Sequence, residues 1–180
     1  MGNSKAILAD SRKEVREHAI AARRDAKGGV ILVPVDFSDH SKAALLQAAE
    51  YAQVMRASLV VLHVVHDPGE MPGYYSKLIK KKRATRIQDM AADAFDHFME
   101  ETSEEHPKLE SLRNSARLMV RGLPVTRILE VVDYLEPMMV VMGSQGRTGL
   151  KHLVMGSKAA QIVQLCPVPV TIVKKKASVD

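Results

Sequence analysis

The hydrophobic positions of this chain gather into short continuous runs that alternate with amphipathic stretches. The runs predict five buried strands, at Val30–Val35, Leu59–Val65, Arg117–Val120, Met138–Met142 and Val168–Val173. Because these runs have no regularly spaced polar residue, neither face of the strand is suited to solvent exposure. This pattern is typical of parallel sheets that are covered on both faces.

The stretches between these runs repeat their apolar residues at helical spacing. Helices are predicted to about Met55 after the first strand, from about Tyr75 to Thr102, from Pro124 to Leu135, and from Lys158 to Leu165. In the long second helix, the expected inner face includes Ile87, Met90, Ala94 and Phe98. Strands that alternate with helices predict an α/β fold, an open five-stranded parallel sheet with helices on both faces in a Rossmann-like arrangement.

Ligands of such sheets bind beyond the carboxyl ends of the strands. Here those ends are Pro34-Val35-Asp36, Val64-Val65, Arg121-Gly122 and Met142-Gly143. We therefore expect one crevice to collect them.

Residues 1–28 lie outside this alternation and predict a helical N-terminal extension to a domain of residues 29–176. Ser11 and Glu14 have the spacing of a capping box, and Val15 and Ala19 belong to a thin apolar stripe. A stripe this narrow predicts a helix that packs weakly, or against a partner.

The composition indicates one soluble domain in a reducing compartment. The chain has 180 residues, 46% of them hydrophobic, with no run long enough to cross a bilayer. Its beginning lacks the apolar centre of a signal peptide, and its single cysteine, Cys166, cannot form an internal disulfide. We expect a cytoplasmic protein in which Cys166 is an inert, buried thiol.

Four glycines follow the Met138–Met142 run within a short basic segment that contains Arg147, Lys151 and Lys158. They are Gly143, Gly146, Gly149 and Gly156. Glycines let backbone N–H groups converge on an anion, and a helix N-terminus adds partial positive charge, so this segment predicts a phosphate-binding loop. The order of residues differs from a Walker loop and from Gly-x-Gly-x-x-Gly. Ser157 is the expected cap of the helix that follows.

The spacing of Gly143, Gly146 and Gly156-Ser157 resembles the ATP-binding signature of the universal stress protein family. Four further blocks agree, in order: Ile31–Ser38, Leu62–Val65, Gly122–Pro124 and Pro167–Val170. The resemblance covers about residues 29–174. It implies the adenine-nucleotide alpha-hydrolase-like fold and a cytoplasmic regulatory module of the stress response that binds ATP with slow or no hydrolysis.

The resemblance also implies which residues would bind the nucleotide. Adenine and ribose would lie against Pro34, Asp36 and Val64, with Met142 supporting the ribose. The phosphates, with Mg2+, would lie on Gly143, Ser144, Gln145, Gly146, Arg147, Thr148, Gly149, Gly156, Ser157, Lys158 and Ala159. Asp36 could equally cap the next helix, and only the resemblance favours ligand contact.

The resemblance further implies a homodimer through the C-terminal strand, Val168–Val173. An apolar strand at a sheet edge is commonly covered or paired. No membrane partner is expected.

Two other functions remain open on the sequence. The first is a slow ATPase or adenylyl-transferring enzyme of the same fold superfamily, although no general base stands near the glycine loop and no hydrolytic triad is readable. The second is nucleic-acid binding, which the net charge of +5 favours and the 4% aromatic content opposes.

Two charged or ligating groups have ordinary structural interpretations. The basic segment Lys80–Arg83 could bind phosphate, but a charge run on a helix is more often solvated surface. His63, His66 and Asp67 lack an established zinc pattern, and a packed histidine is favoured at His63.

Overall fold

The computed structural model describes residues 6–9, 11–25, 28–65, 81–146 and 155–175, with only the backbone for residues 25 and 81–86. The strands are β1 (Ile7–Ala9), β2 (Val30–Val35), β3 (Ser58–Val65), β4 (Ala116–Arg121), β5 (Met139–Gly143) and β6 (Val170–Val173). The helices are α1 (Arg12–Asp25), α2 (Asp39–Met55), α3 (Lys81–Glu105), α4 (Glu110–Arg113), α5 (Pro124–Leu135) and α6 (Ser157–Leu165).

The described strands form one parallel sheet in the order β1-β4-β3-β2-β5-β6. The five predicted strands are confirmed, but the sheet has a sixth. β1 pairs with β4 through Ile7 opposite Leu118 and Ala9 opposite Val120, so the N-terminal segment supplies an edge strand as well as a helix. Three residues are too few to show a strand pattern in the sequence.

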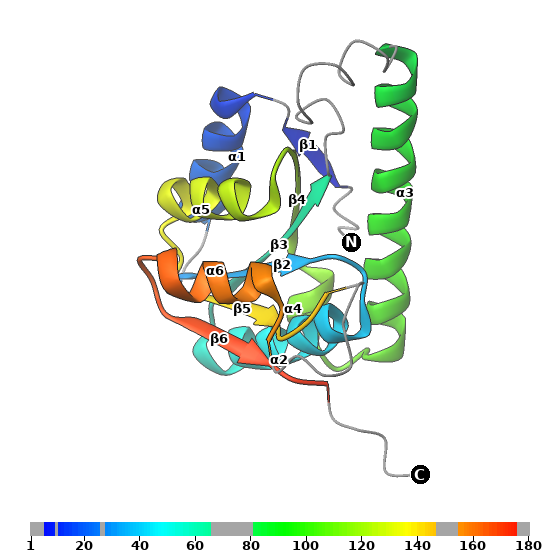
Figure 1. Ribbon diagram of the computed structural model, residues 1–180. Helices are drawn as coiled ribbons and strands as arrows, with labels where there is room; N and C mark the ends of the chain where they lie inside the picture. The colour runs from blue at the N-terminus through cyan, green and yellow to red at the C-terminus, as the bar shows by residue number, and fades with distance from the viewer. Residues whose placement is uncertain (1–5, 10, 26–27, 66–80, 147–154, 176–180) are drawn as a thin grey trace.

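Helices cover both faces of the sheet, as the apolar runs predict (Figure 1). α1, α5 and α6 lie over one face, where Leu32 and Leu62 join one core cluster. α2, α3 and α4 lie over the other, where the adjacent residues Ile31 and Val61 join a second cluster. Successive side chains of a strand point to opposite faces, so the central strands need apolar residues at successive positions and not only at alternate ones.

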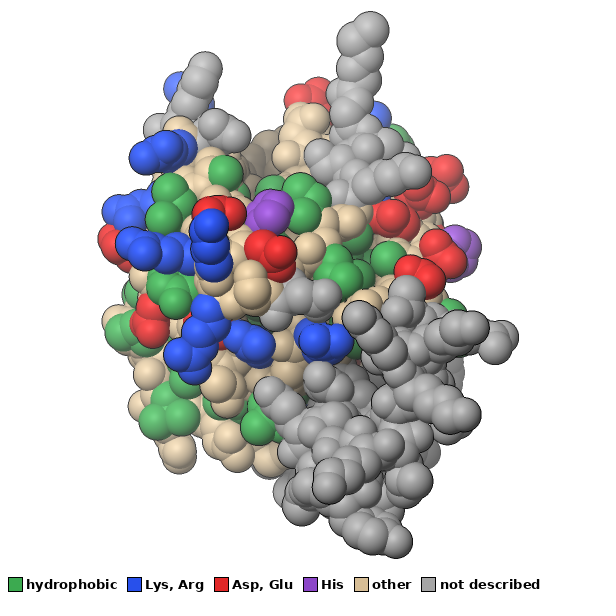
Figure 2. Space-filling model, turned by 90° about the horizontal axis from the view of Figure 1, so that it is seen from above, with side chains coloured by type: hydrophobic (Ala, Val, Ile, Leu, Met, Phe, Trp, Pro, Cys, Tyr) green, Lys and Arg blue, Asp and Glu red, His purple; other side chains and the backbone are tan. Residues whose placement is uncertain are grey.

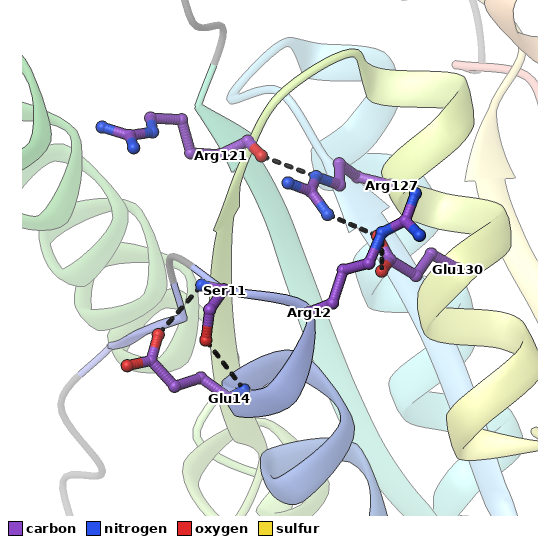
Figure 3. Close-up of polar contacts among 6 residues, drawn as sticks. All are labelled: Ser11, Arg12, Glu14, Arg121, Arg127 and Glu130. Carbon is purple, nitrogen blue, oxygen red and sulfur yellow. Dashed lines mark hydrogen bonds and ion pairs between the residues drawn. The ribbon is translucent and has the colours of Figure 1, made fainter.

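Helix α1 begins at the predicted capping box. The amide of Glu14 donates to Ser11 Oγ at 3.2 Å, and the amide of Ser11 donates to Glu14 Oε2 at 3.0 Å (Figure 3). The expectation of weak packing is wrong, because Val15 and Ala19 are each only 1% exposed and belong to the core beneath α5. The narrow stripe suffices because short side chains let α1 approach α5 closely.

Helix α3 turns inward only part of the face that the sequence predicts, since Phe98 is buried and Ile87 packs against the core, but Met90 and Ala94 do not. Phe95, Phe98 and Met99 are buried, whereas Met90 is 63% exposed and Ala94 is also exposed. The helix is apolar on more than one side, so the buried side is decided by contact with Phe37 and the sheet. The part of the expected helix before residue 81 lies outside the described residues.

A buried charge joins α3 to the edge of the sheet. Arg117 of β4 is 4% exposed, and its Nη1 donates to Oδ1 of Asp96 at 3.0 Å. The same oxygen accepts a hydrogen bond from the amide of Ala6, just before β1. Asp96 therefore links α3, β4 and the N-terminal segment.

The surface in Figure 2 mixes charge types, with basic side chains gathered toward one side and acidic ones more numerous on the other. Hydrophobic side chains lie exposed among them. Among the described helices, none has the length and apolar character that a membrane span requires.

Candidate functional site

The site begins where β2 ends, at Asp36. Its Oδ1 accepts hydrogen bonds from the amide of Ser38 at 3.2 Å and from Ser38 Oγ at 2.6 Å. Ser38 in turn is the N-cap of α2, and its Oγ accepts from the amide of Ser41. Asp36 therefore does not cap the helix itself, but is held in place by the residue that does.

Phe37, between these two residues, has a left-handed backbone with φ of 64°. A bulky residue rarely adopts this conformation, which costs of order 1 kcal/mol or more. Its ring stacks on His63 at a centroid distance of 4.2 Å and also contacts Phe95 and Phe98. These ring contacts hold the turn that presents Asp36.

The second part of the site lies where β5 ends. The amide of Ser144 donates to the carbonyl of Val173 in β6, and the Ser144 carbonyl accepts from the amide of Gly156 at 2.8 Å. The chain thus leaves the sheet after Ser144, and Gly156 lies beside Ser144 again. This contact brings the two ends of the predicted glycine loop together.

Two helix N-termini point to this region, those of α5 and α6. Pro124 is the first residue of α5, as predicted. Ser157 is the first residue of α6 and Gly156 is its N-cap, so the expectation that Ser157 caps α6 is wrong. Neither described N-cap residue, Leu123 or Gly156, makes a side-chain hydrogen bond to its helix, and the first-turn N–H groups are left for other acceptors.

These elements enclose a pocket of about 400 Å³, a size common for small-molecule sites. Eleven predicted residues line it: Pro34, Asp36, Val64, Met142, Gly143, Gln145, Gly146, Gly156, Ser157, Lys158 and Ala159. Its described lining also includes Val35, Ser41, Leu62, His63, Pro124 and Ile128, which were not among the predicted site residues. Ile128 lies on the apolar face of the predicted helix, which indicates that it is buried. The pattern does not show whether it is buried in the core or lines a pocket.

Four predicted site residues do not belong to this described lining. Ser144 is 3% exposed and its Oγ lies 3.4 Å from Nδ1 of His40, under the pocket rather than on its surface. Arg147, Thr148 and Gly149 lie outside the described residues.

The three glycines at the site differ in why glycine stands at that position. A β-carbon at Gly143 would lie 2.8 Å from the backbone C and O atoms of His40, so this glycine lets α2 approach β5. A β-carbon at Gly146 would lie 2.6 Å from Oδ2 of Asp36. At Gly156 the nearest atom would be 3.6 Å away, so the protein's own atoms leave room for a side chain there.

His63 is a packed histidine, as the sequence favours. Its Nδ1 is 2.9 Å from the carbonyl oxygen of Val35, and its ring stacks on Phe37. The described residues hold no group of three or more His, Cys, Asp or Glu side chains suited to a metal ion. His66 and Asp67 lie outside the described residues.

The arrangement suits a ligand that is apolar at one end and anionic at the other. Pro34, Leu62, Val64 and Met142 form an apolar wall, and Asp36 offers a carboxylate to donors beside it. Lys158 and the start of α6 add positive charge to the same lining.

Comparison with known proteins identifies the family and the fold of this chain. The sequence model of the universal stress protein family matches residues 29–174. A universal stress protein of Methanocaldococcus jannaschii is 23% identical over 82% of this chain and 96% of its own length. Its solved structure aligns with a TM-score of 0.66 at 24% identity, covering 84% of this chain and 99% of that one.

Two other solved structures of the family contain adenine nucleotides. A universal stress protein in complex with cAMP is 18% identical over 81% of this chain and 95% of that chain, with a TM-score of 0.55. One from Archaeoglobus fulgidus in complex with dAMP is 17% identical over 80% of this chain and 95% of that chain, with a TM-score of 0.50. At these identities the likeness shows a shared fold.

The family model covers most of the chain, including every described strand except β1. The fold that it implies is the one observed. This chain belongs to the universal stress protein family.

Proposed function

We propose that this protein is a regulatory module that binds ATP in the pocket at the ends of β2, β3 and β5. The observation that carries the proposal is the meeting of the Asp36 carboxylate, the backbone of Gly146 and the start of α6 around one pocket. The carboxylate suits the hydroxyls of the sugar. The bare backbone of Gly146 lets a phosphate approach closely, and the start of α6 supplies positive charge for it.

The parts of the nucleotide would be held by different groups. Adenine lies against Pro34 and Val64, and Met142 supports the ribose, whose hydroxyls donate to Asp36. The phosphates lie along Gly143–Gly146 and against the first N–H groups of α6, with Lys158 beside them. Arg147, Thr148 and Gly149, outside the described residues, would extend this surface.

Mg2+ would accompany the phosphates and share their charge. Since the described residues form no cluster of carboxylates and histidines, phosphate oxygens and water would supply most of its ligands. No protein metal site is therefore needed for nucleotide binding.

The relatives support an adenine nucleotide in particular. Two members of the family with the same fold were solved with cAMP and dAMP. The signature glycines are all present in this chain, which favours ATP.

The pocket supports binding more than turnover. Hydrolysis needs a base that positions water at the terminal phosphate. Among the described lining residues, Asp36 is the one carboxylate that could act as this base. It accepts hydrogen bonds from Ser38 and lies where the ribose is proposed to bind. We therefore propose slow or no hydrolysis.

A homodimer through the C-terminal strand completes the proposal. β6 is an edge strand of the described sheet, and all four of its residues are half-buried. Pairing with a second copy would cover this edge. The lone, half-buried Cys166 suits a reducing cytoplasm.

Calorimetry tests nucleotide binding directly, with ATP, AMP and GTP titrated into the full chain in the presence of Mg2+. We expect ATP to bind, and the comparison with GTP measures the preference for adenine. No adenine nucleotide binding at millimolar concentration would overturn the proposal. Release of phosphate or pyrophosphate at enzyme-like rates would instead indicate an ATPase or an adenylyl-transferring enzyme. Sedimentation velocity tests for the dimer.

A further inference from the structure

A second hollow, larger than the pocket, is lined by residues of α5 and α6 and by Arg12 of α1. It is an open groove of about 850 Å³. Its apolar lining includes Leu123 and Leu129 from the start and middle of α5, and Leu165 from the end of α6. Leu123 is 49% exposed and Leu165 is 60% exposed.

The groove is continuous with the pocket. Pro124, Ser157 and Lys158 line both hollows. Ser157 and Lys158 form the start of α6, where the proposed function places the phosphates. A group attached to the terminal phosphate would therefore leave the pocket into the groove.

The charges of the groove indicate what kind of group fits. Arg12 and Lys158 are balanced by Glu130 and Asp133 among its described lining residues. Glu130 is also held by Arg127, and Arg12 approaches it from α1 at 3.5 Å (Figure 3). The charged side chains of the groove therefore sum to zero, and the exposed carboxylate of Asp133 repels a further phosphate.

The apolar residues of the groove favour an uncharged occupant. Leu123 and Leu165 are among the large hydrophobic side chains that stay exposed in the described structure. Leu123, Leu129 and Leu165 line the same groove, so an apolar group lying in it would cover all three side chains. ATP alone ends at its phosphates and would leave this surface in water.

We propose that the groove receives an uncharged, largely apolar group carried as an ester on the terminal phosphate of the bound adenine nucleotide. The inference rests on the proposed function, since it uses the same pocket and the same direction for the phosphates. It extends the ligand class from free ATP to adenine nucleotides conjugated at their phosphate end. Covering Leu165 and Leu123 is the source of the added affinity.

The experiment compares the γ-phenyl ester of ATP with its γ-methyl ester. Both esters lack one charged oxygen of the terminal phosphate, so they carry the same charge. Affinities are measured by calorimetry on the full chain with Mg2+, and ATP is the reference ligand. We expect the phenyl ester to bind about tenfold more tightly than the methyl ester, as burial of a ring predicts.

Leu165→Ser assigns the effect to the groove. It should remove most of the phenyl preference and leave the methyl ester and ATP unchanged, because Leu165 is exposed and does not line the pocket. Val163→Ser is the matched control, since Val163 is 44% exposed on the same helix and lines neither hollow. It should leave all three affinities unchanged.

The outcomes separate this inference from the proposed function. Equal affinities of the two esters, with ATP still binding, would overturn the inference alone, and so would a phenyl preference that survives Leu165→Ser. Failure of ATP itself to bind would overturn both. A dimer in sedimentation velocity that Leu165→Ser dissociates would assign the groove to a second copy of the chain and overturn the inference.

Discussion

The carboxylate of Asp36 lies directly against the backbone of Gly146, so that a β-carbon on Gly146 would fall 2.6 Å from Oδ2. The two residues follow different strands, β2 and β5, which are neighbours in the sheet. Their contact joins the proposed sugar-binding side of the pocket to the proposed phosphate loop.

Gly146→Val should abolish measurable ATP binding while the protein stays folded. The branched side chain must displace the Asp36 carboxylate or enter the pocket, and either change disturbs the site. Calorimetry measures the affinity, and circular dichroism with thermal unfolding checks the fold. Wild-type affinity in a folded variant would contradict the site described above.

Gly143→Ala should mainly lower stability, whereas Gly156→Ala should mainly lower ATP affinity. The new β-carbon at residue 143 meets the backbone of His40 and should lower the free energy of unfolding by about 1–3 kcal/mol, a typical cost of overpacking. At residue 156 there is room within the protein, so stability should fall by less than about 1 kcal/mol while ATP affinity decreases.

Urea unfolding and calorimetry on both variants test this pair. If Gly156→Ala leaves ATP affinity intact, the phosphates do not approach the start of α6. If Gly143→Ala is as stable as the wild type, the contact between α2 and β5 is looser than the structure shows.

Asp36→Ala should weaken ATP binding by about 1–3 kcal/mol, because the carboxylate supplies charge-assisted hydrogen bonds. Ser38→Ala is the comparison, since it removes the N-cap of α2 and one donor to Asp36 but leaves the carboxylate present. It should cost about 1 kcal/mol of stability and less affinity than Asp36→Ala. Equal loss of affinity would mean that Asp36 acts only by shaping the turn.

Asp96→Ala should lower the free energy of unfolding by about 2–3 kcal/mol, which is less than the usual cost of breaking a fully buried ion pair because Asp96 is partly exposed. The change removes the carboxylate that holds Arg117 and the amide of Ala6. The double variant Asp96→Ala/Arg117→Met should recover part of this loss. Urea unfolding measures it, and no recovery would show that the charge of Arg117 is not the cause.

Lys175→Met should raise the pKa of Asp39 toward its ordinary value. The hydrogen bond and charge of Lys175 lower the pKa of the Asp39 carboxyl in the folded protein. The contribution of this pair to stability is therefore present above the ordinary carboxyl pKa and is lost as the pH falls through the lowered pKa. An NMR titration of the Asp39 carboxyl measures the shift, and an unchanged pKa would show that the pair does not persist in solution.

Much of the fold was predictable because its determinants are local or periodic. The central strands are apolar on both faces, and both faces are covered, so the runs at Val30–Val35 and Leu59–Val65 identify them directly. The Ser11–Glu14 capping box and the proline at the start of α5 also act within one turn of helix. These features need no knowledge of distant contacts.

The sequence predicted many of the residues that meet at the pocket, but not the structural role of each one. Eleven of the fifteen residues named from the family resemblance line one pocket, but their individual roles differ from what spacing suggests. Gly143 makes room for α2, Ser144 lies beneath the pocket, and Gly156 rather than Ser157 is the N-cap. Each of these depends on an element that is distant in sequence or on one turn of backbone geometry.

The sequence by itself determined the order of strands and helices, the two-sided burial of the sheet and the segments that carry the nucleotide signature, because these are encoded in local apolar runs and turn residues. Only the tertiary structure decided that Ile7–Ala9 joins β4, which face of α3 is buried and how Asp36 meets Gly146. These depend on contacts between segments far apart in the chain, where packing and hydrogen-bond partners, and not local preference, select one arrangement.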